Sequence, residues 1–256
     1  MSLGAHDVAL VRAGNPGPFT LTGTNTWLVG RDPCWVVDPG PALDDHLVAV
    51  LAEGERRGGI AGIVVTHDHH DHVDGLEALR AATGAPVAAA RGEVETVLRD
   101  GDTIGPFAVL ATPGHAPDHL AFLGAGVAFT GDAVLGEGSV FVLGQLGAYL
   151  AALGRLKDAA PALLCCGHGP VVEDPAAHLD GYVAHRLERE RALVAALDDG
   201  LRGVDELLDR VWADAPEALR LAAAVTLDAH LGKLDDDGRL PDGVERVDLP
   251  TDLRAP

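Results

Sequence analysis

Short apolar runs alternate with helix-like segments over the first two thirds of the chain. Three segments, 44–55, 73–83 and 149–156, carry apolar residues at helical spacing. Runs typical of buried strands lie at 21–29, 34–37, 60–66, 87–90, 107–112, 120–123, 127–130 and 162–166. This alternation of strands and helices predicts a domain of the mixed α/β (α+β) class.

The last third of the chain has a different pattern. Long helix-like segments occupy 176–197, 204–212 and 215–234. Residues 235–249 then place a Pro241-Asp242-Gly243 turn between two short pieces that can form strands. Three helices followed by a hairpin outline a winged-helix-like region. We therefore divide the chain into a catalytic domain, 1–174, and a C-terminal helical, winged-helix-like region, 175–256.

Composition predicts a folded cytoplasmic protein. The 256 residues are 47% hydrophobic, which is enough for a large core. The chain shows no basic segment followed by an apolar one at its start and no stretch long enough to cross a membrane. Its three cysteines, Cys34, Cys165 and Cys166, are interpreted as reduced core residues.

Charge argues against extended nucleic-acid binding. The net charge of −20 repels phosphate backbones and anionic membranes at long range. The only concentrated basic patch is interleaved with Glu188 and Glu190, so we favour a solvated helix face over a site for a substrate anion. This patch consists of His185, Arg186, Arg189 and Arg191.

The run 66–72 concentrates potential metal ligands directly after the apolar run that precedes it. Four of its side chains are suitable: His67, His69, Asp71 and His72. Imidazole and carboxylate together suit borderline divalent ions, above all zinc. The alternative is a solvated, His-rich loop.

Three later strand-like runs also end in a histidine or aspartate beside glycine. These residues are His115, Asp132 and His168. If the strands share one sheet edge, seven ligands meet there, which is too many for one tetrahedral ion. Two metals with three ligands each and one bridging carboxylate would accommodate them.

Other polar residues near these runs have secondary roles in our interpretation. Asp38 either hydrogen-bonds a ligand histidine or caps a turn. His119 either lines the pocket or, as we favour, is structural, and His230 is expected to be packed in a helix. Asp68 and His70 alternate with the ligands and are expected to point away from the metals.

The pattern resembles the metallo-β-lactamase-fold superfamily over 25–169. The resemblance implies an αββα sandwich and a dinuclear zinc site at one edge of its two sheets. It assigns His67, His69 and His115 to the first metal, and Asp71, His72 and His168 to the second, with Asp132 as the bridge. A metal-bridging hydroxide would attack the substrate, and Asp71 would both ligate and orient this nucleophile.

Three further motifs are similar to those of the β-lactamase-like protein 2 group. They are Gly23-Thr24-Asn25-Thr26-Trp27-Leu28-Val29, Leu135-Gly136-Glu137-Gly138 after Gly131-Asp132, and Gly167-His168-Gly169-Pro170 before the helix with Tyr182, His185 and Arg186. Members of that group include endonucleases for single-stranded RNA, and related fungal proteins are thioesterases for carrier-bound polyketides. Where some antibiotic-degrading relatives have a cysteine, this chain has Asp132, which argues against β-lactam hydrolysis.

The sequence thus predicts a zinc-dependent hydrolase of an ester, thioester or phosphodiester, with a small-molecule or carrier-bound acyl substrate favoured. The alternatives are an endoribonuclease for single-stranded RNA, an iron-dependent persulfide dioxygenase with one Fe²⁺ in place of two Zn²⁺, and a non-catalytic metal-binding protein. The C-terminal region is expected to wall the active site or to form a homodimer contact. DNA binding by this region is disfavoured, because the segment 215–234 carries only Arg220 and Lys233 as basic residues apart from its histidine.

Overall fold

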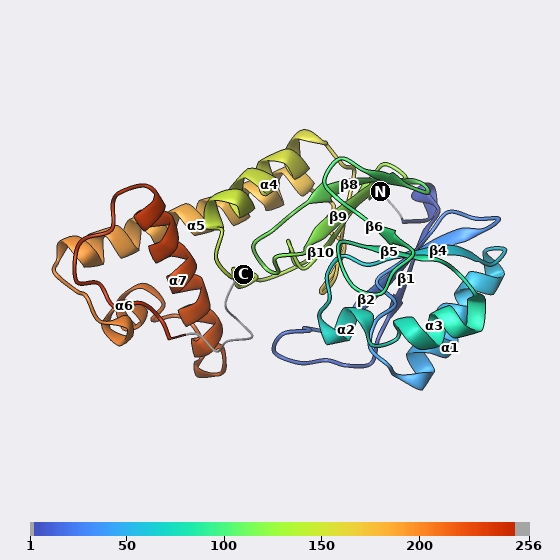
Figure 1. Cartoon of the computed structure of the whole chain (residues 1–256), viewed down its shortest axis with the longest axis horizontal. Helices are drawn as coiled ribbons and strands as arrows, with labels where there is room; N and C mark the ends of the chain where they lie inside the picture. Colours follow the sequence, from blue (N-terminus) through green and yellow to red (C-terminus); the bar gives the residue numbers. More distant parts are fainter. Residues whose placement is uncertain (1–2, 249–256) are drawn as a thin grey trace.

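Two β-sheets stack at the centre of the structure, a computed structural model that describes residues 3–248 (Figure 1). Six strands form the first sheet, in the order β1-β2-β3-β4-β5-β6. They are β1 (Val8–Arg12), β2 (Asn25–Val29), β3 (Cys34–Val37), β4 (Ile60–Val64), β5 (Val87–Ala89) and β6 (Thr96–Val97). β2, β3, β4 and β5 all lie within strands predicted from the sequence. β6 has only two residues, which is too short for a hydrophobic pattern to predict it.

Five strands form the second sheet, in the order β11-β10-β9-β8-β7. They are β7 (Thr103–Ile104), β8 (Phe107–Ala111), β9 (Leu120–Gly124), β10 (Val127–Gly131) and β11 (Leu164–Cys166). β10 pairs in parallel with β11, while β8 and β9 are antiparallel neighbours. The chain thereby brings the ends of β10 and β11 to the same edge.

Helices cover the outer face of each sheet, which confirms the predicted αββα sandwich. Outside the first sheet lie α1 (Asp44–Arg56) and α3 (Leu76–Thr83), and outside the second lie α4 (Leu146–Asp158) and the start of α5 (Pro175–Asp198) (Figure 1). A core containing Trp27, Phe107 and Phe129 fills the space between the sheets.

The alternation of side chains along β11 explains the adjacent cysteines. Cys165 points into the core between the sheets, and Cys166 points to the core under α4 and α5. Both thiols are free and buried, and burial raises their pKa values. They are therefore packing residues, as the sequence predicts.

The C-terminal region packs three helices around a core of its own. α5 extends out of the sandwich to meet α6 (Val204–Val211) and α7 (Arg220–Asp236), with a 3-10 turn, Glu217–Leu219, before α7 (Figure 1). The predicted hairpin is wrong over the residues that the structure describes, since 239–248 form no strand; Leu249 lies outside them. The boundary at residue 174 coincides with the start of α5, and the division of the chain into two domains stays a prediction.

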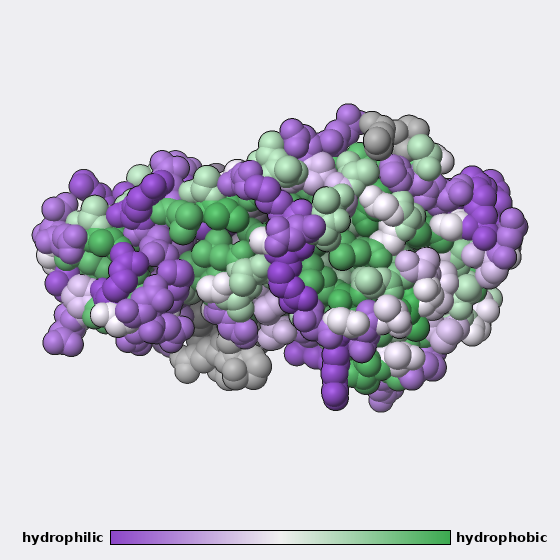
Figure 2. Space-filling view, turned by 90° about the horizontal axis from the view of Figure 1, so that it is seen from above, coloured by the Kyte–Doolittle hydropathy of each residue, from purple (hydrophilic) through white to green (hydrophobic). Residues whose placement is uncertain are grey.

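On the face shown in Figure 2, hydrophilic residues predominate at both ends of the molecule, and hydrophobic residues gather toward its middle. Within residues 3–248, the helices are all too short or too polar to cross a bilayer.

Candidate metal centre

Seven predicted ligands meet at one edge of the sandwich. Four of them lie just after β4 or in the short helix α2 (His70–Val73), and the others follow β8, β10 and β11. The structure gathers them into three overlapping groups: His67, His69 and His115; His67, His72 and Asp132; and Asp71, His72 and His168. The ligand atoms within each group lie within 4.8 Å of one another.

The first of these groups is built from three imidazole rings. Nδ1 of His69 lies 2.9 Å from Nε2 of His67 and 3.0 Å from Nε2 of His115. All three rings are therefore directed at one point.

The second part of the cluster contains both carboxylates. Nε2 of His168 lies 3.2 Å from Oδ2 of Asp71, 3.3 Å from Oδ2 of Asp132 and 3.3 Å from Nε2 of His72. Oδ2 of Asp132 also lies 3.6 Å from Nε2 of His115, in the first group. Asp132 thus stands between the two groups, where a bridging carboxylate is expected.

Asp38 fixes two of the rings from behind. Its Oδ2 accepts hydrogen bonds from Nδ1 of His72, at 2.9 Å, and from the hydroxyl of Thr66, at 2.8 Å. Because that hydroxyl gives its only proton to Asp38, it accepts from Nδ1 of His67, 3.0 Å away. Both rings therefore carry a proton on Nδ1 and direct Nε2 into the cluster.

Backbone carbonyls hold two more rings in the same way. Nδ1 of His115 lies 3.4 Å from the Phe141 carbonyl, and Nδ1 of His168 lies 3.5 Å from the Gly23 carbonyl. With Nδ1 as donor, Nε2 of His115 offers a lone pair to the cluster, and Nε2 of His168 is directed at Asp71 and Asp132. Nε2 of His67 and Nε2 of His115 both lie within 3.0 Å of Nδ1 of His69, and three converging imidazole nitrogens are a donor set that fits divalent metal.

The charges at the site point to the same conclusion. Burial lowers the pKa of His115 to about 4 and that of His67 well below its usual value, so both rings are neutral, as ligands must be. At His168, burial acts to lower the pKa, but Asp132 and Asp71 outweigh it and raise the pKa to about 9. Buried Oδ1 of Asp132 accepts no hydrogen bond from a described residue. The carboxylates therefore favour positive charge at this point.

Asp71 is the ligand candidate best placed to meet a substrate. Its side chain is 28% exposed, compared with 9% for Asp132. Burial acts to raise its pKa, but hydrogen bonds from His168 and Thr24, together with the charge of His72, lower it to about 2. The Thr24 hydroxyl donates to Oδ2 of Asp71 at 2.8 Å. Asp71 is thus an ionised carboxylate at the border of site and solvent.

Glycine lets the strand ends approach one another closely. A Cβ atom on Gly167 would lie 2.4 Å from Oδ1 of Asp132, and one on Gly131 would lie 2.5 Å from Oγ1 of Thr66. Gly131 also has a φ of 46°, which favours glycine. The glycines next to the ligands are therefore required by geometry.

The remaining residues singled out in the sequence fall outside the cluster. The Asp132 backbone N–H donates to Nε2 of His119 at 3.1 Å, so Nδ1 of His119 carries the proton and donates to Thr112. His119 is thus structural, as expected. His70 pairs with Asp74 and Asp68 with Arg91, both away from the metal ligands.

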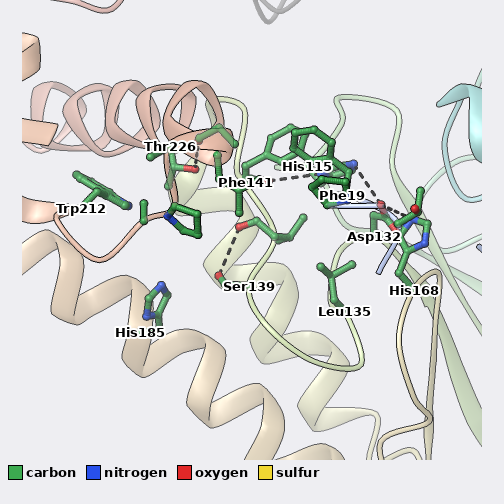
Figure 3. A pocket seen from close by; sticks show the side chains of 18 of the residues that line it. Phe19, His115, Asp132, Leu135, Ser139, Phe141, His168, His185, Trp212 and Thr226 are labelled. Atoms are coloured by element: carbon green, nitrogen blue, oxygen red, sulfur yellow. Dashed lines mark hydrogen bonds and ion pairs between the residues drawn. The ribbon is translucent and has the colours of Figure 1, made fainter. Parts of the chain in front are cut away.

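A cavity of about 520 Å³ leads from the cluster to the C-terminal helices (Figure 3). His69, Asp71, His115, Asp132 and His168 lie at one end, and Trp212 and His185 at the other. Phe19 and Phe141 lie beside the metal cluster, with their rings packed edge to face at 6.3 Å between centroids. The C-terminal region therefore walls the site, which is one of the two roles predicted for it.

Our interpretation of Arg186 is wrong, because its side chain is not on a solvated helix face. Arg186 is 3% exposed, and Glu190 is 8% exposed. The residues 139–140, in a loop far away in the sequence, cover Arg186 and accept its hydrogen bonds. Thr24, which hydrogen-bonds Asp71, was not predicted as a site residue, although its place in the 23–29 motif is a signal that could have found it.

Two family models match the chain. One, described as the metallo-beta-lactamase superfamily, matches residues 19–103, and the other, a beta-lactamase associated winged helix domain, matches residues 204–242.

Similar proteins cover most of the chain. A beta-lactamase-like protein 2 homolog of Caenorhabditis elegans is 34% identical over 88% of this chain and 82% of its own length. An atrochrysone carboxyl ACP thioesterase of Aspergillus chevalieri is 35% identical, over 82% of this chain and 74% of its own. A solved metallo-beta-lactamase family protein of Thermus thermophilus has a TM-score of 0.73, is 24% identical, and covers 91% of this chain and 94% of its own.

Proposed function

Because this chain belongs to the metallo-beta-lactamase superfamily of hydrolases, we propose that it is a dinuclear zinc enzyme that hydrolyses ester or thioester bonds. Convergence of seven ligand groups at one end of the cavity carries the proposal. His67, His69 and His115 would hold one zinc ion, and Asp71, His72 and His168 the other, with Asp132 between them.

The groups of the site have different roles in the proposed hydrolysis. When bound, the zinc ions supply Lewis acidity, which lowers the pKa of water and polarises the acyl oxygen of the substrate. Asp71, ionised and partly exposed, accepts a hydrogen bond from the attacking water and orients it. Asp38 keeps His67 and His72 in the ligating tautomer through its contacts with Thr66 and His72.

The walls of the cavity favour an acyl substrate over a phosphodiester. Phe19 and Phe141 offer apolar surface beside the cluster, and Leu219 also lines the cavity, whereas a nucleic-acid strand requires basic groups along the whole of its groove. The acidic character of the chain supports the same choice. A relative at 35% identity is named a thioesterase for a carrier-protein substrate, and we propose a carrier-bound or small-molecule acyl thioester here.

A substrate panel on zinc-loaded protein tests this proposal. Acyl thioesters, lactones, a chromogenic phosphodiester and single-stranded RNA should be compared by kcat/KM. We expect thioesters to be cleaved fastest, and Asp71→Ala to lower kcat by at least about 100-fold. Asp74→Ala is the matched control, since Asp74 lies in the same segment and pairs with His70 outside the cluster.

Other outcomes of the panel would redirect the assignment. Preferential cleavage of single-stranded RNA would make the enzyme an endoribonuclease. Oxygen consumption with a persulfide and iron, without hydrolysis of any ester, would replace the hydrolase with a dioxygenase. Full thioesterase activity in Asp71→Ala would contradict the role given to that carboxylate.

A further inference from the structure

The end of the cavity farthest from the metal cluster is lined by basic residues of α5. His185, Arg186 and Arg189 face this end, together with Trp212 and Asp214 (Figure 3 labels His185 and Trp212). In a chain of net charge −20, two arginines within one cavity wall require an explanation. None of these groups has a role in the hydrolytic step.

Arg186 is a buried cation without a carboxylate partner among the residues that the structure describes. It donates to the Ser139 hydroxyl at 2.9 Å and to the Val140 carbonyl. Its Nε is buried and has no hydrogen-bond partner in the described chain, and the guanidinium lies 5.9 Å from the centre of the Tyr149 ring. Burying a charge is costly unless an opposite charge compensates it, and no carboxylate within residues 3–248 pairs with Arg186.

The neighbouring groups leave this positive charge uncompensated. Arg189 pairs with Asp214 at 2.6 Å and also donates to the Val211 carbonyl. That carboxylate is 69% exposed and offers weak compensation. The ring of His185 makes no hydrogen bond with a residue in the range 3–248 and remains available as a donor or acceptor at the cavity wall.

We propose that this basic end binds a carboxylate carried by the acyl part of the substrate, distal to the bond that is cleaved. The inference deepens the proposed function and rests on it. The acyl half is assigned to the cavity because the surface between the metal cluster and the basic end is apolar, with Phe141, Leu219 and Ala223 among its residues. The substrate class is therefore an acyl thioester with a long apolar body and a distal oxyanion.

Binding of uncleavable analogues tests the inference without requiring turnover. Amide analogues of the thioester, ending either in a methyl or in a carboxylate, should be compared by calorimetry with zinc-loaded protein over a series of chain lengths. At the best length, we expect the distal carboxylate to tighten binding about 10-fold, as a hydrogen bond between charged groups does. Arg189→Gln should abolish most of this gain, and Arg189→Lys should retain most of it.

The control variant is Arg191→Gln, which makes the same charge change on the exposed side of α5, outside the cavity. It should leave the gain unchanged, and thermal unfolding will show that each variant is folded. Equal binding of the two analogues by the wild-type protein, at every length, would overturn the inference.

A second pair of analogues distinguishes the source of the anion. Amides built on pantetheine and on phosphopantetheine differ only in a phosphate on the thiol side. If the gain that depends on Arg189 follows this phosphate and not the acyl carboxylate, the proposed orientation is wrong. The binding experiment does not depend on hydrolysis, because the amide analogues are not cleaved. A failed thioesterase assay would therefore contradict the proposed function, whereas equal binding of the two analogues would contradict the carboxylate site.

Discussion

At the scale of single residues, the site depends on side chains that never reach the substrate. Asp38 is 1% exposed, yet its carboxylate accepts hydrogen bonds from the Thr66 backbone N–H, from the Thr66 hydroxyl and from His72. A single buried group thus sets the tautomer of two ligand rings. The sequence suggested such a role for Asp38 but could not separate it from turn capping, because the two roles place the same residue at the same strand end.

Asp38→Asn should weaken metal binding while preserving the fold. The amide keeps the size of the carboxylate but loses one acceptor and the negative charge, so it cannot serve both Thr66 and His72. We expect a loss of about 10–100-fold in zinc affinity, measured by competition with a chromogenic chelator. Asp74→Asn, on an exposed carboxylate, is the control. Unchanged zinc affinity in Asp38→Asn would show that the ring orientations are held by other contacts.

Other residues of the site illustrate why sequence reasoning was incomplete. The ligands could be predicted because each follows an apolar strand. The groups that orient them could not, since the Phe141 and Gly23 carbonyls are backbone atoms without any side-chain signal. Thr24 reaches Asp71 across 47 positions of the chain, a contact that only the fold creates.

At the scale of elements, predictions succeeded where periodicity determines structure. The run 107–112 corresponds to β8, Phe107–Ala111, and the segment 44–55 to α1, Asp44–Arg56. Short elements that form only through pairing with another strand were not predicted. An example is β7, which has two residues and pairs with β8. α7 begins at Arg220, five residues later than expected, after Pro216 and a 3-10 turn. Tertiary contacts, and not local propensity, decide these boundaries.

The helix α7 contains a buried histidine that should make stability depend on pH. His230 is fully buried, and neither ring nitrogen has a hydrogen-bond partner in the described chain. Burial, followed by the charges of Arg186 and Lys233, lowers its pKa to about 3. Since the unfolded chain binds the proton near the usual pKa of 6.5, this contribution to stability is present above pH 6.5 and is lost as the pH falls toward 3.

His230→Leu should remove that dependence. Between pH 7 and pH 5, we expect the free energy of unfolding of the wild-type protein to fall by about 2 kcal/mol more than that of the variant. Urea unfolding of both proteins at the two pH values measures the difference. An equal decrease in both would mean that His230 does not titrate as its burial requires.

At the scale of the whole molecule, the sandwich and the C-terminal helices make one site together. The ligands come from the edge of the two sheets, while Trp212, Leu219 and Thr226 of the C-terminal region wall the cavity beyond them. The αββα architecture and the site-walling role followed from the sequence, but the predicted hairpin did not form in the described residues. The cavity therefore lies between the sandwich and the C-terminal helices, and both contribute residues to its walls.

Zinc titration of chelator-stripped protein, with bound metal and thioester hydrolysis followed together, tests the central claim most directly. The claim is that two metal ions act at one cluster, three ligands to each with Asp132 between them. We predict that hydrolysis rises until two zinc ions are bound per chain and then stays constant. Full hydrolysis with one zinc ion per chain, or activity with one Fe²⁺ and none with zinc, would contradict the dinuclear zinc assignment.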